Sequence, residues 1–382
     1  MMPNPLPIGP DGPVVRDYGS GTLLIGDVRD GLRWMIEQGL KINMCVTSPP
    51  YWGLRDYGVK GQLGAEPRPQ EYVPNLVEIF RLVRDVLAEN GTLWLNIGDS
   101  YSGSGINDGS TNPGLSKAAQ RGGVKGRRPG NSCCPGYKPK DLCMIPAQVA
   151  IALRDDGWWL RSEIVWHKPN PMPESVRDRP TRNHEMVYLL SKSRKYFYDA
   201  DAIRTPYAES TLKEFEKGYN DNDTKDYGTA GVQSPSSVKK RVLSVPNSPQ
   251  SIKSPHGQGF TRRADKQRGH SRRHAGFNDR WDSMTKKGQQ HDGANARTVW
   301  TIATEPFSGS HFAAFPQELA RRCVLTGSHP GDIVLDPFMG SGTTAQVAES
   351  LGRRWIGCEL NPDYEQLLKT RLAQPNMIGG MV

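Results

Sequence analysis

The sequence predicts an α/β fold with a doubly wound, mostly parallel sheet. Short apolar runs typical of strands alternate with amphipathic helical segments along much of the 382 residues. Such alternation is typical of a parallel sheet with helices on both faces. Chemically active residues follow several predicted strands directly, which is where parallel sheets bind ligands. The length also allows one large α/β domain and a second module.

Five strands and two helices are predicted in the first half of the chain. Apolar runs and their polar ends place the strands at 22–25, 42–46, 92–97, 160–166 and 185–190. Apolar residues at helical spacing predict a helix over 71–90, which Asn90-Gly91 would stop. Another helix is expected over 146–155.

The α/β rhythm is lost in the middle of the chain and returns near its end. Residues 205–300 are rich in Ser, Pro, Gly, Lys and Arg, which indicates a recognition module or a segment that folds on binding. Helices 315–325 and 344–351, strands 333–335 and 355–358 and a last helix then follow. We therefore expect four parts: a tail (1–19), a catalytic part (20–204), a basic insert (205–300) and a cofactor-binding part (301–382).

Composition narrows the class of protein. Residues 232–300 hold 14 Lys and Arg against 4 Asp and Glu, and this local excess suggests a surface for a polyanion. No apolar stretch approaches the roughly 20 residues that span a bilayer, and residues 1–13 lack a signal-peptide pattern, so we expect a cytoplasmic protein. The six cysteines lack the paired spacing of a zinc site, and no metal is expected.

A glycine-rich turn between a predicted strand and a predicted helix indicates a cofactor site. Its residues include Asp336, Pro337, Phe338, Gly340, Ser341, Gly342 and Thr343. Glycines let the backbone approach a ligand closely, and the free amides of the helix start face that ligand. Glu359 ends the next strand, where a carboxylate can accept hydrogen bonds from both hydroxyls of a ribose. These features indicate a nucleoside-containing cofactor and leave NAD and S-adenosylmethionine equally open.

A second motif, Ser48, Pro49, Pro50 and Tyr51, decides between these cofactors. Two prolines give a rigid turn without amide hydrogens, so its carbonyls are held in place as acceptors. An exocyclic amine on a base is a poor nucleophile because its lone pair is delocalised into the ring. Acceptors at the Ser48 hydroxyl and the Pro49 carbonyl favour a pyramidal nitrogen whose lone pair points at a methyl sulfonium. Tyr51 offers a face on which an extruded base can stack.

Together the two motifs resemble the amino-methyltransferases of DNA, in the permuted group whose catalytic motif precedes the cofactor motif. The resemblance covers nearly all of the α/β portion. It implies a seven-stranded methyltransferase sheet, S-adenosyl-L-methionine as cofactor and a base flipped out of double-stranded DNA. It implies that the turn from Asp336 to Thr343 lines the cofactor and that Glu359 holds its ribose. Asp27 matches the acid that contacts the adenine amine, and a segment ending at Phe315 and Pro316 resembles the element around the methionine end.

Serine at the first catalytic position is typical of cytosine-N4 enzymes in this family, whereas Asp or Asn is typical of adenine-N6 enzymes. Ser48 therefore favours site-specific methylation of cytosine N4, with adenine N6 as the alternative. Methylation of RNA or of a protein glutamine is a second hypothesis, which Ser48 and the motif order disfavour. A DNA-binding module with a degenerate methyltransferase fold is a third, which the intact motifs disfavour.

The basic insert is the predicted DNA contact. Its candidate residues are Arg262, Arg263, Lys266, Arg268, Arg272, Arg273, Arg280, Lys286 and Lys287. Such side chains neutralise phosphates, and arginines also bind guanine edges; a solvated insert without a ligand is the alternative. We expect the protein to be associated with the nucleoid. The sequence leaves open whether it acts with a partner restriction endonuclease, and whether it is a monomer or a homodimer.

Overall fold

The computed structural model describes residues 12–54, 59, 61–102, 136–207, 293–304 and 316–374. The chain divides into two compact units, one of residues 1–203 and 297–382 and the other of residues 204–296. In the second unit the described ends meet, because Thr205 and Ala294 exchange backbone hydrogen bonds of 2.9 and 2.8 Å. The predicted DNA-contacting residues Arg262 to Lys287 lie outside the described residues, so that assignment stays a prediction.

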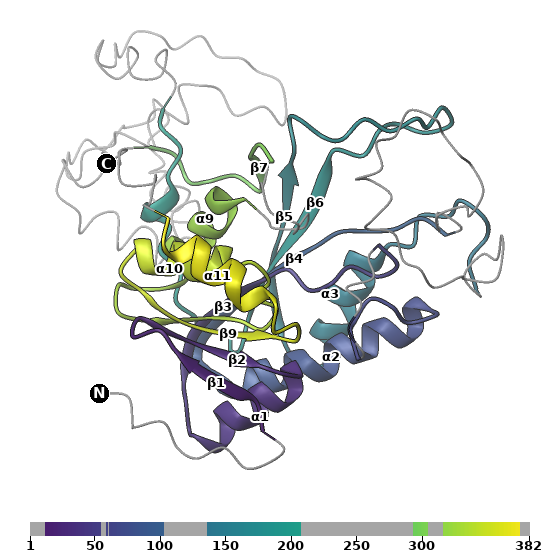
Figure 1. Ribbon diagram of the computed structural model, residues 1–382. Helices are drawn as coiled ribbons and strands as arrows, with labels where there is room; N and C mark the ends of the chain where they lie inside the picture. The colour runs from purple at the N-terminus through teal and green to yellow at the C-terminus, as the bar shows by residue number, and fades with distance from the viewer. Residues whose placement is uncertain are drawn as a thin grey trace, which may run out of the picture. The chain divides into compact units, whose positions relative to one another are not determined.

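A sheet organises the first unit, and its nine described strands lie in the order β1-β2-β9-β8-β3-β4-β6-β5-β7 (Figure 1). The strands are β1 (Val14–Asp17), β2 (Gly21–Ile25), β3 (Ile42–Thr47), β4 (Leu87–Ile97), β5 (Trp159–His167), β6 (His184–Ser191), β7 (Val299–Thr301), β8 (Ile333–Asp336) and β9 (Arg354–Glu359). Among these only β1 and β6 run against the others. The mostly parallel sheet is confirmed. The seven strands from β2 to β5 are flanked by the short edge strands β1 and β7.

Helices cover both faces of this sheet, as a doubly wound fold requires. They are α1 (Val28–Glu37), α2 (Pro69–Val86), α3 (Ile145–Asp155), α9 (Gln317–Gly327), α10 (Thr343–Ser350) and α11 (Tyr364–Leu372), with a short 3₁₀ turn at Asp201–Ile203. The first three helices lie on one side of the sheet and the last three on the other (Figure 1). Apolar residues of α1, α2 and α3 form one buried cluster with the sheet, and those of α9, α10 and α11 form a second. In the described ranges, no helix has the length and apolar character to cross a membrane.

The end of α2 differs from the sequence prediction. The sequence places a stop at Asn90-Gly91, but the helix ends at Val86 and the chain enters β4 at Leu87. Ile42 of β3 pairs with Leu87 whereas Met44 pairs with Thr92, so β4 carries extra residues opposite β3. Pairing with β3 and burial of the Leu87 side chain therefore override the local stop, and the turn residues lie in a bulge inside the strand.

Strand polarity brings the chemically active segments to one edge of the sheet. After β3 the chain passes through α2 to β4, whereas after β8 it passes through α10 to β9 on the other side. The neighbouring strands β3 and β8 are therefore a topological switch point, where a crevice opens beyond the strand ends. Ser48 directly follows β3, and Asp336 ends β8.

Gly21 opens β2 directly against a buried indole. A Cβ at this position would lie 2.1 Å from Trp355 Cε2, and Trp355 is fully buried, with its Nε1 donating to Glu349 at 2.8 Å. Because the indole has no room to move, we expect Gly21→Ala to lower the free energy of unfolding by about 1–3 kcal/mol, the usual cost of overpacking. Urea denaturation measures this effect. Gly39→Asn is the control, because open space surrounds Gly39 at its φ of 64°, which asparagine tolerates.

Candidate active site

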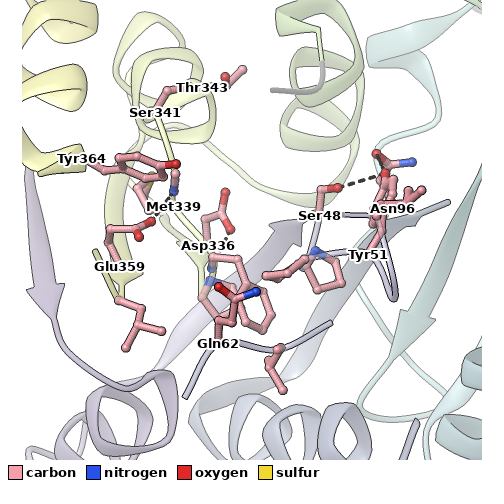
Figure 2. A pocket seen from close by; sticks show the side chains of 18 of the residues that line it. Ser48, Tyr51, Gln62, Asn96, Asp336, Met339, Ser341, Thr343, Glu359 and Tyr364 are labelled. Carbon is pink, nitrogen blue, oxygen red and sulfur yellow. Dashed lines mark hydrogen bonds between the residues drawn. The ribbon is translucent and has the colours of Figure 1, made fainter. Parts of the chain in front are cut away.

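A cavity of about 670 Å³ opens at the switch point, beyond the carboxyl ends of the central strands. Both sequence motifs line it although they are far apart in the chain. The predicted site residues in its wall are Asp27, Ser48, Pro49, Pro50, Tyr51, Asp336, Pro337, Phe338, Gly340, Ser341, Thr343 and Glu359. In Figure 2, Ser48 and Tyr51 lie on one side of the cavity, Glu359 lies on the other, and Asp336 is between them.

Two of the predicted cofactor residues that the structure describes, Gly342 and Pro316, are not in the wall of the cavity. Gly342 is the N-cap of α10, with φ of 85°, and a Cβ there would lie 2.2 Å from Leu368 Cδ1, so this glycine lets α11 pack against the turn. Pro316 is buried at the start of α9, where its carbonyl accepts hydrogen bonds from two amides of the first turn. Phe315 lies outside the described residues.

Asp336 ties β3, β8 and α10 together beneath the cavity. Its Oδ1 accepts hydrogen bonds from the Thr47 hydroxyl at 2.6 Å and from the Phe338 amide at 3.0 Å. Its Oδ2 accepts one from the Thr344 hydroxyl at 2.6 Å. Burial raises the pKa of Asp336 to about 6, although these three hydrogen bonds act in the opposite direction. The carboxylate therefore fixes the glycine-rich turn relative to the catalytic strand.

Glu359 braces the same turn from β9. Its Oε2 accepts a hydrogen bond from the Gly340 amide at 2.8 Å, and its Oε1 accepts one from the Asn361 amide at 2.8 Å. Burial raises the pKa of Glu359 to about 7, against the effect of these amides. Each oxygen of a carboxylate has two lone pairs, so both retain acceptor capacity toward the cavity that Glu359 lines.

Two further polar groups of this half come from the starts of two helices. Asp27 is the N-cap of α1, where its Oδ1 accepts a hydrogen bond from the Arg29 amide at 2.7 Å. Thr343 begins α10, and its buried Oγ1 has no hydrogen-bond partner among the described residues. A buried hydroxyl without a partner in the wall of a cavity fits a polar ligand that would complete its hydrogen bonding.

Ser48 and Tyr51 form a hydrogen-bonded network on the other side of the cavity. The Ser48 hydroxyl donates to the Tyr51 hydroxyl at 3.1 Å. The Tyr51 hydroxyl donates to Glu185 Oε2 at 2.6 Å. It also lies 3.1 Å from Asn96 Oδ1 (Figure 2). Burial and the Glu185 carboxylate hold the pKa of Tyr51 well above its ordinary value, so its hydroxyl keeps its proton.

The proline turn is fixed by its neighbours as well as by its own rings. Tyr72 of α2 donates a hydrogen bond to the Pro50 carbonyl at 2.8 Å. The Tyr51 ring packs on Gly98, where a Cβ would lie 2.5 Å from ring atom Cε2. One side of the ring is therefore occupied by backbone, and its hydroxyl is bound by the network.

Sequence reasoning did not single out several residues of the cavity. Among them are Gln62, Asn96, Trp166, Arg182, Glu185 and Tyr364. Glu185 is the second residue of β6, and because β6 is antiparallel to β4 and β5, the start of this strand lies at the edge where those strands end. Only polar residues that follow a predicted strand were considered in the sequence, so Glu185 was not identified there. In the described part of the chain, no three His, Cys, Asp or Glu side chains are grouped to hold a metal ion.

Two raised carboxyl pKa values predict how stability depends on pH. The pKa is about 6 for Asp336 and about 7 for Glu359 in the folded protein, whereas both groups titrate near pH 4 when unfolded. The folded state therefore holds more protons between about pH 4 and pH 7. We expect the cofactor-free protein to lose stability as the pH rises through this window.

Chemical denaturation at pH 5, 6, 7 and 8 measures that trend. In Glu359→Gln the decline should be shallower, because one of the two titrating groups is gone. The matched control is Glu37→Gln on the exposed surface of α1, which should keep the wild-type slope. An equally steep decline in Glu359→Gln would contradict the expected role of Glu359.

Comparison with known proteins shows the family to which the chain belongs. The N6/N4 methyltransferase family, described as DNA methylase, matches residues 42–370. The chain is similar to the type II methyltransferase M.SmaI of Serratia marcescens, with 39% identity over 353 residues that cover 92% of this chain and 90% of that protein. It is 38% identical over 356 residues to the type II methyltransferase M.Cfr9I of Citrobacter freundii, covering 93% and 89%. The chain therefore belongs to the N6/N4 DNA methylase family.

A solved structure supports the fold independently. The PvuII DNA methyltransferase, described as cytosine-N4-specific, has a TM-score of 0.50 to this chain at 17% sequence identity and covers 94% of this chain and 88% of that chain. At this identity the likeness concerns the fold alone. The expected resemblance to the DNA amino-methyltransferases and the expected methyltransferase fold are both confirmed.

Proposed function

We propose that this protein transfers a methyl group from S-adenosyl-L-methionine to the exocyclic N4 of cytosine at specific sites in double-stranded DNA. The observation that carries the proposal is the shared cavity. Ser48, a hydroxyl at the end of β3, lines it together with Glu359 and the glycine-rich turn. A hydrogen-bond acceptor for an amine and a binding surface for a nucleoside therefore line the same cavity.

The residues beyond β2, β8 and β9 fit the proposed cofactor. Glu359 accepts a hydrogen bond from the Gly340 amide and retains lone pairs that can accept hydrogen bonds from ribose hydroxyls. Asp27 lines the same space from the start of α1 and supplies an acceptor for the adenine amine. The Thr343 hydroxyl, buried without a partner among the described residues, supplies a further polar contact. When bound, the cofactor supplies an electrophilic methyl carbon on a positively charged sulfur.

The residues beyond β3 would act on the base. Ser48 accepts a hydrogen bond from the amine, which favours the pyramidal nitrogen whose lone pair is free to react. A cofactor held by Glu359 and Asp27 would supply the methyl group to this lone pair and would leave as a neutral thioether, and the amine would release one proton to solvent. The rigid turn of Pro49 and Pro50 holds the acceptor in place while this happens.

Cytosine N4 is favoured over adenine N6 because serine occupies the first position of the catalytic motif. Adenine N6 is the alternative, since a hydroxyl can accept a hydrogen bond from either amine. We further propose that the basic insert contacts the DNA, and that the protein acts as the methyltransferase of a restriction–modification pair in the cytoplasm, at the nucleoid. The type II methyltransferases among its relatives support the second of these proposals.

Nucleoside analysis tests the proposal directly. DNA incubated with the protein and the cofactor is digested to nucleosides and analysed by mass spectrometry. We expect N4-methylcytosine; N6-methyladenine alone would instead establish the alternative. The absence of any methylated nucleoside, with the cofactor shown to bind by calorimetry, would refute DNA methylation. Mapping the modified positions on the same DNA gives the target sequence.

A further inference from the structure

Glu185 is the central acceptor of the network behind Ser48. Its Oε2 accepts hydrogen bonds from the Tyr51 hydroxyl at 2.6 Å and from Asn96 Nδ2 at 3.3 Å. Its Oε1 binds the Lys168 ammonium, and this ion pair is largely buried, with 16% and 19% of the two side chains exposed. The proposed role of Ser48 does not by itself explain why Glu185 and Lys168 are placed in the wall of the cavity.

The network has one direction of hydrogen bonding. Asn96 donates its Nδ2 to the Met186 carbonyl at 3.2 Å, which turns its Oδ1 toward the Tyr51 hydroxyl. Tyr51 therefore has two acceptors beside its oxygen, the amide oxygen and the Glu185 carboxylate, and its single proton must point to them. A lone pair of the Tyr51 oxygen then faces Ser48, and Ser48 donates its own proton to it.

This direction decides what Ser48 presents to the cavity. A hydroxyl has one proton and two lone pairs. Because the Ser48 proton is engaged in the hydrogen bond to Tyr51, the Ser48 oxygen can only accept hydrogen bonds from a ligand in the cavity. If the Ser48 proton pointed into the cavity, it would face the hydrogens of the amine. Ser48 could then not accept a hydrogen bond from the amine, and the amine lone pair would stay delocalised into the ring.

We propose that Glu185 is a positioning residue that acts through Tyr51 to hold the Ser48 hydroxyl as a hydrogen-bond acceptor for the amine. The inference rests on the proposed function and adds a residue from β6 to it. Lys168 stabilises the carboxylate that the arrangement needs, because its ammonium pairs with Oε1 and leaves Oε2 to Tyr51. Its Nζ also lies 4.3 Å from the centre of the Trp166 ring, which fixes its place in the wall.

Glu185→Gln tests the direction while keeping the shape of the side chain. An amide can donate to the Tyr51 oxygen, which lets the Tyr51 proton turn to Ser48 and the Ser48 proton turn into the cavity. We expect the single-turnover rate of methyl transfer to fall about 10–100-fold, less than or comparable to the loss of one preorganised hydrogen bond in a transition state. Cofactor affinity, measured by calorimetry, should stay within about two-fold, because this network lies away from the Glu359 side.

A double-mutant cycle with Tyr51→Phe separates positioning from a general structural effect. Phenylalanine removes the hydrogen-bonded link through Tyr51 that joins Glu185 to Ser48 among the described residues, so Glu185→Gln should have little further effect on the rate in the Tyr51→Phe background. If the two substitutions damaged the structure independently, their fold-reductions in rate would multiply in the double variant. That result would overturn the proposal. The matched control is Glu163→Gln on the exposed side of the neighbouring strand β5, which should retain the wild-type rate.

The wild-type assay distinguishes failure of this inference from failure of the proposed function. If the wild-type protein methylates no amine in DNA, the proposed function fails; if it does and Glu185→Gln transfers methyl at the wild-type rate, only the role of Glu185 fails. Circular dichroism and thermal unfolding establish that each variant folds. Where Glu185→Gln leaves Lys168 buried without its partner and does not fold, the combined variant Glu185→Gln/Lys168→Gln takes its place in the same cycle, with the same expected results.

Discussion

Replacing Ser48 with alanine is expected to lower the rate of methyl transfer to DNA by about 10²–10³-fold, the usual effect of removing one preorganised group that acts in the transition state. The Ser48 hydroxyl donates a hydrogen bond to Tyr51, so its oxygen is the acceptor that we propose for the amine. Alanine removes this acceptor and leaves the Asp336 and Glu359 side of the cavity intact. Tritiated-methyl transfer under single-turnover conditions measures the rate.

The effect must be confined to the chemical step. Cofactor affinity of Ser48→Ala should match that of the wild-type protein, because no cofactor contact is assigned to Ser48. Ser162→Ala on β5, outside the wall of the cavity, is the matched control and should leave the rate unchanged. Undiminished transfer by Ser48→Ala would show that the catalytic acceptor is not Ser48.

Asp336→Ala is expected to lower the free energy of unfolding by about 3 kcal/mol. The substitution leaves three donors without an acceptor, and each buried unsatisfied group costs about 1–3 kcal/mol. Those donors are the hydroxyls of Thr47 and Thr344 and the amide of Phe338. Relief of the buried carboxyl, whose pKa is raised to about 6 by burial, offsets part of the sum. Denaturant unfolding at pH 7 measures the difference.

Asp336→Asn separates hydrogen bonding from charge. The amide keeps an oxygen for Thr47 and Phe338, and the Thr344 hydroxyl can rotate to accept from its nitrogen, so we expect a loss of no more than about 1 kcal/mol. Asp332→Ala is the control outside the cavity, because the side-chain hydrogen bond that it removes, donated by the His329 amide, is exposed. Equal losses in the alanine and asparagine variants would mean that the charge, rather than the acceptors, matters.

The fold followed from the sequence because its signals are local. Apolar runs with polar ends predicted β2, β3 and β8, whose ends place Asp27, Ser48 and Asp336 at one edge of the sheet. Where pairing partners decided the structure, prediction failed: β4 begins at Leu87 because β3 pairs with it there, and the turn residues Asn90-Gly91 could not indicate this. The short edge strand β1 also depends on its neighbour β2 rather than on its own pattern.

The sequence by itself predicted the family, the two motifs and Ser48 as the proposed acceptor, because these depend on residue types at fixed spacing. Only the tertiary structure decided which groups stand behind that acceptor. Glu185 reaches Tyr51 because β6 runs antiparallel to β4 and starts at the edge where β4 ends. Side chains more than a hundred residues apart meet through strand order and direction, and no local pattern in the chain encodes that meeting.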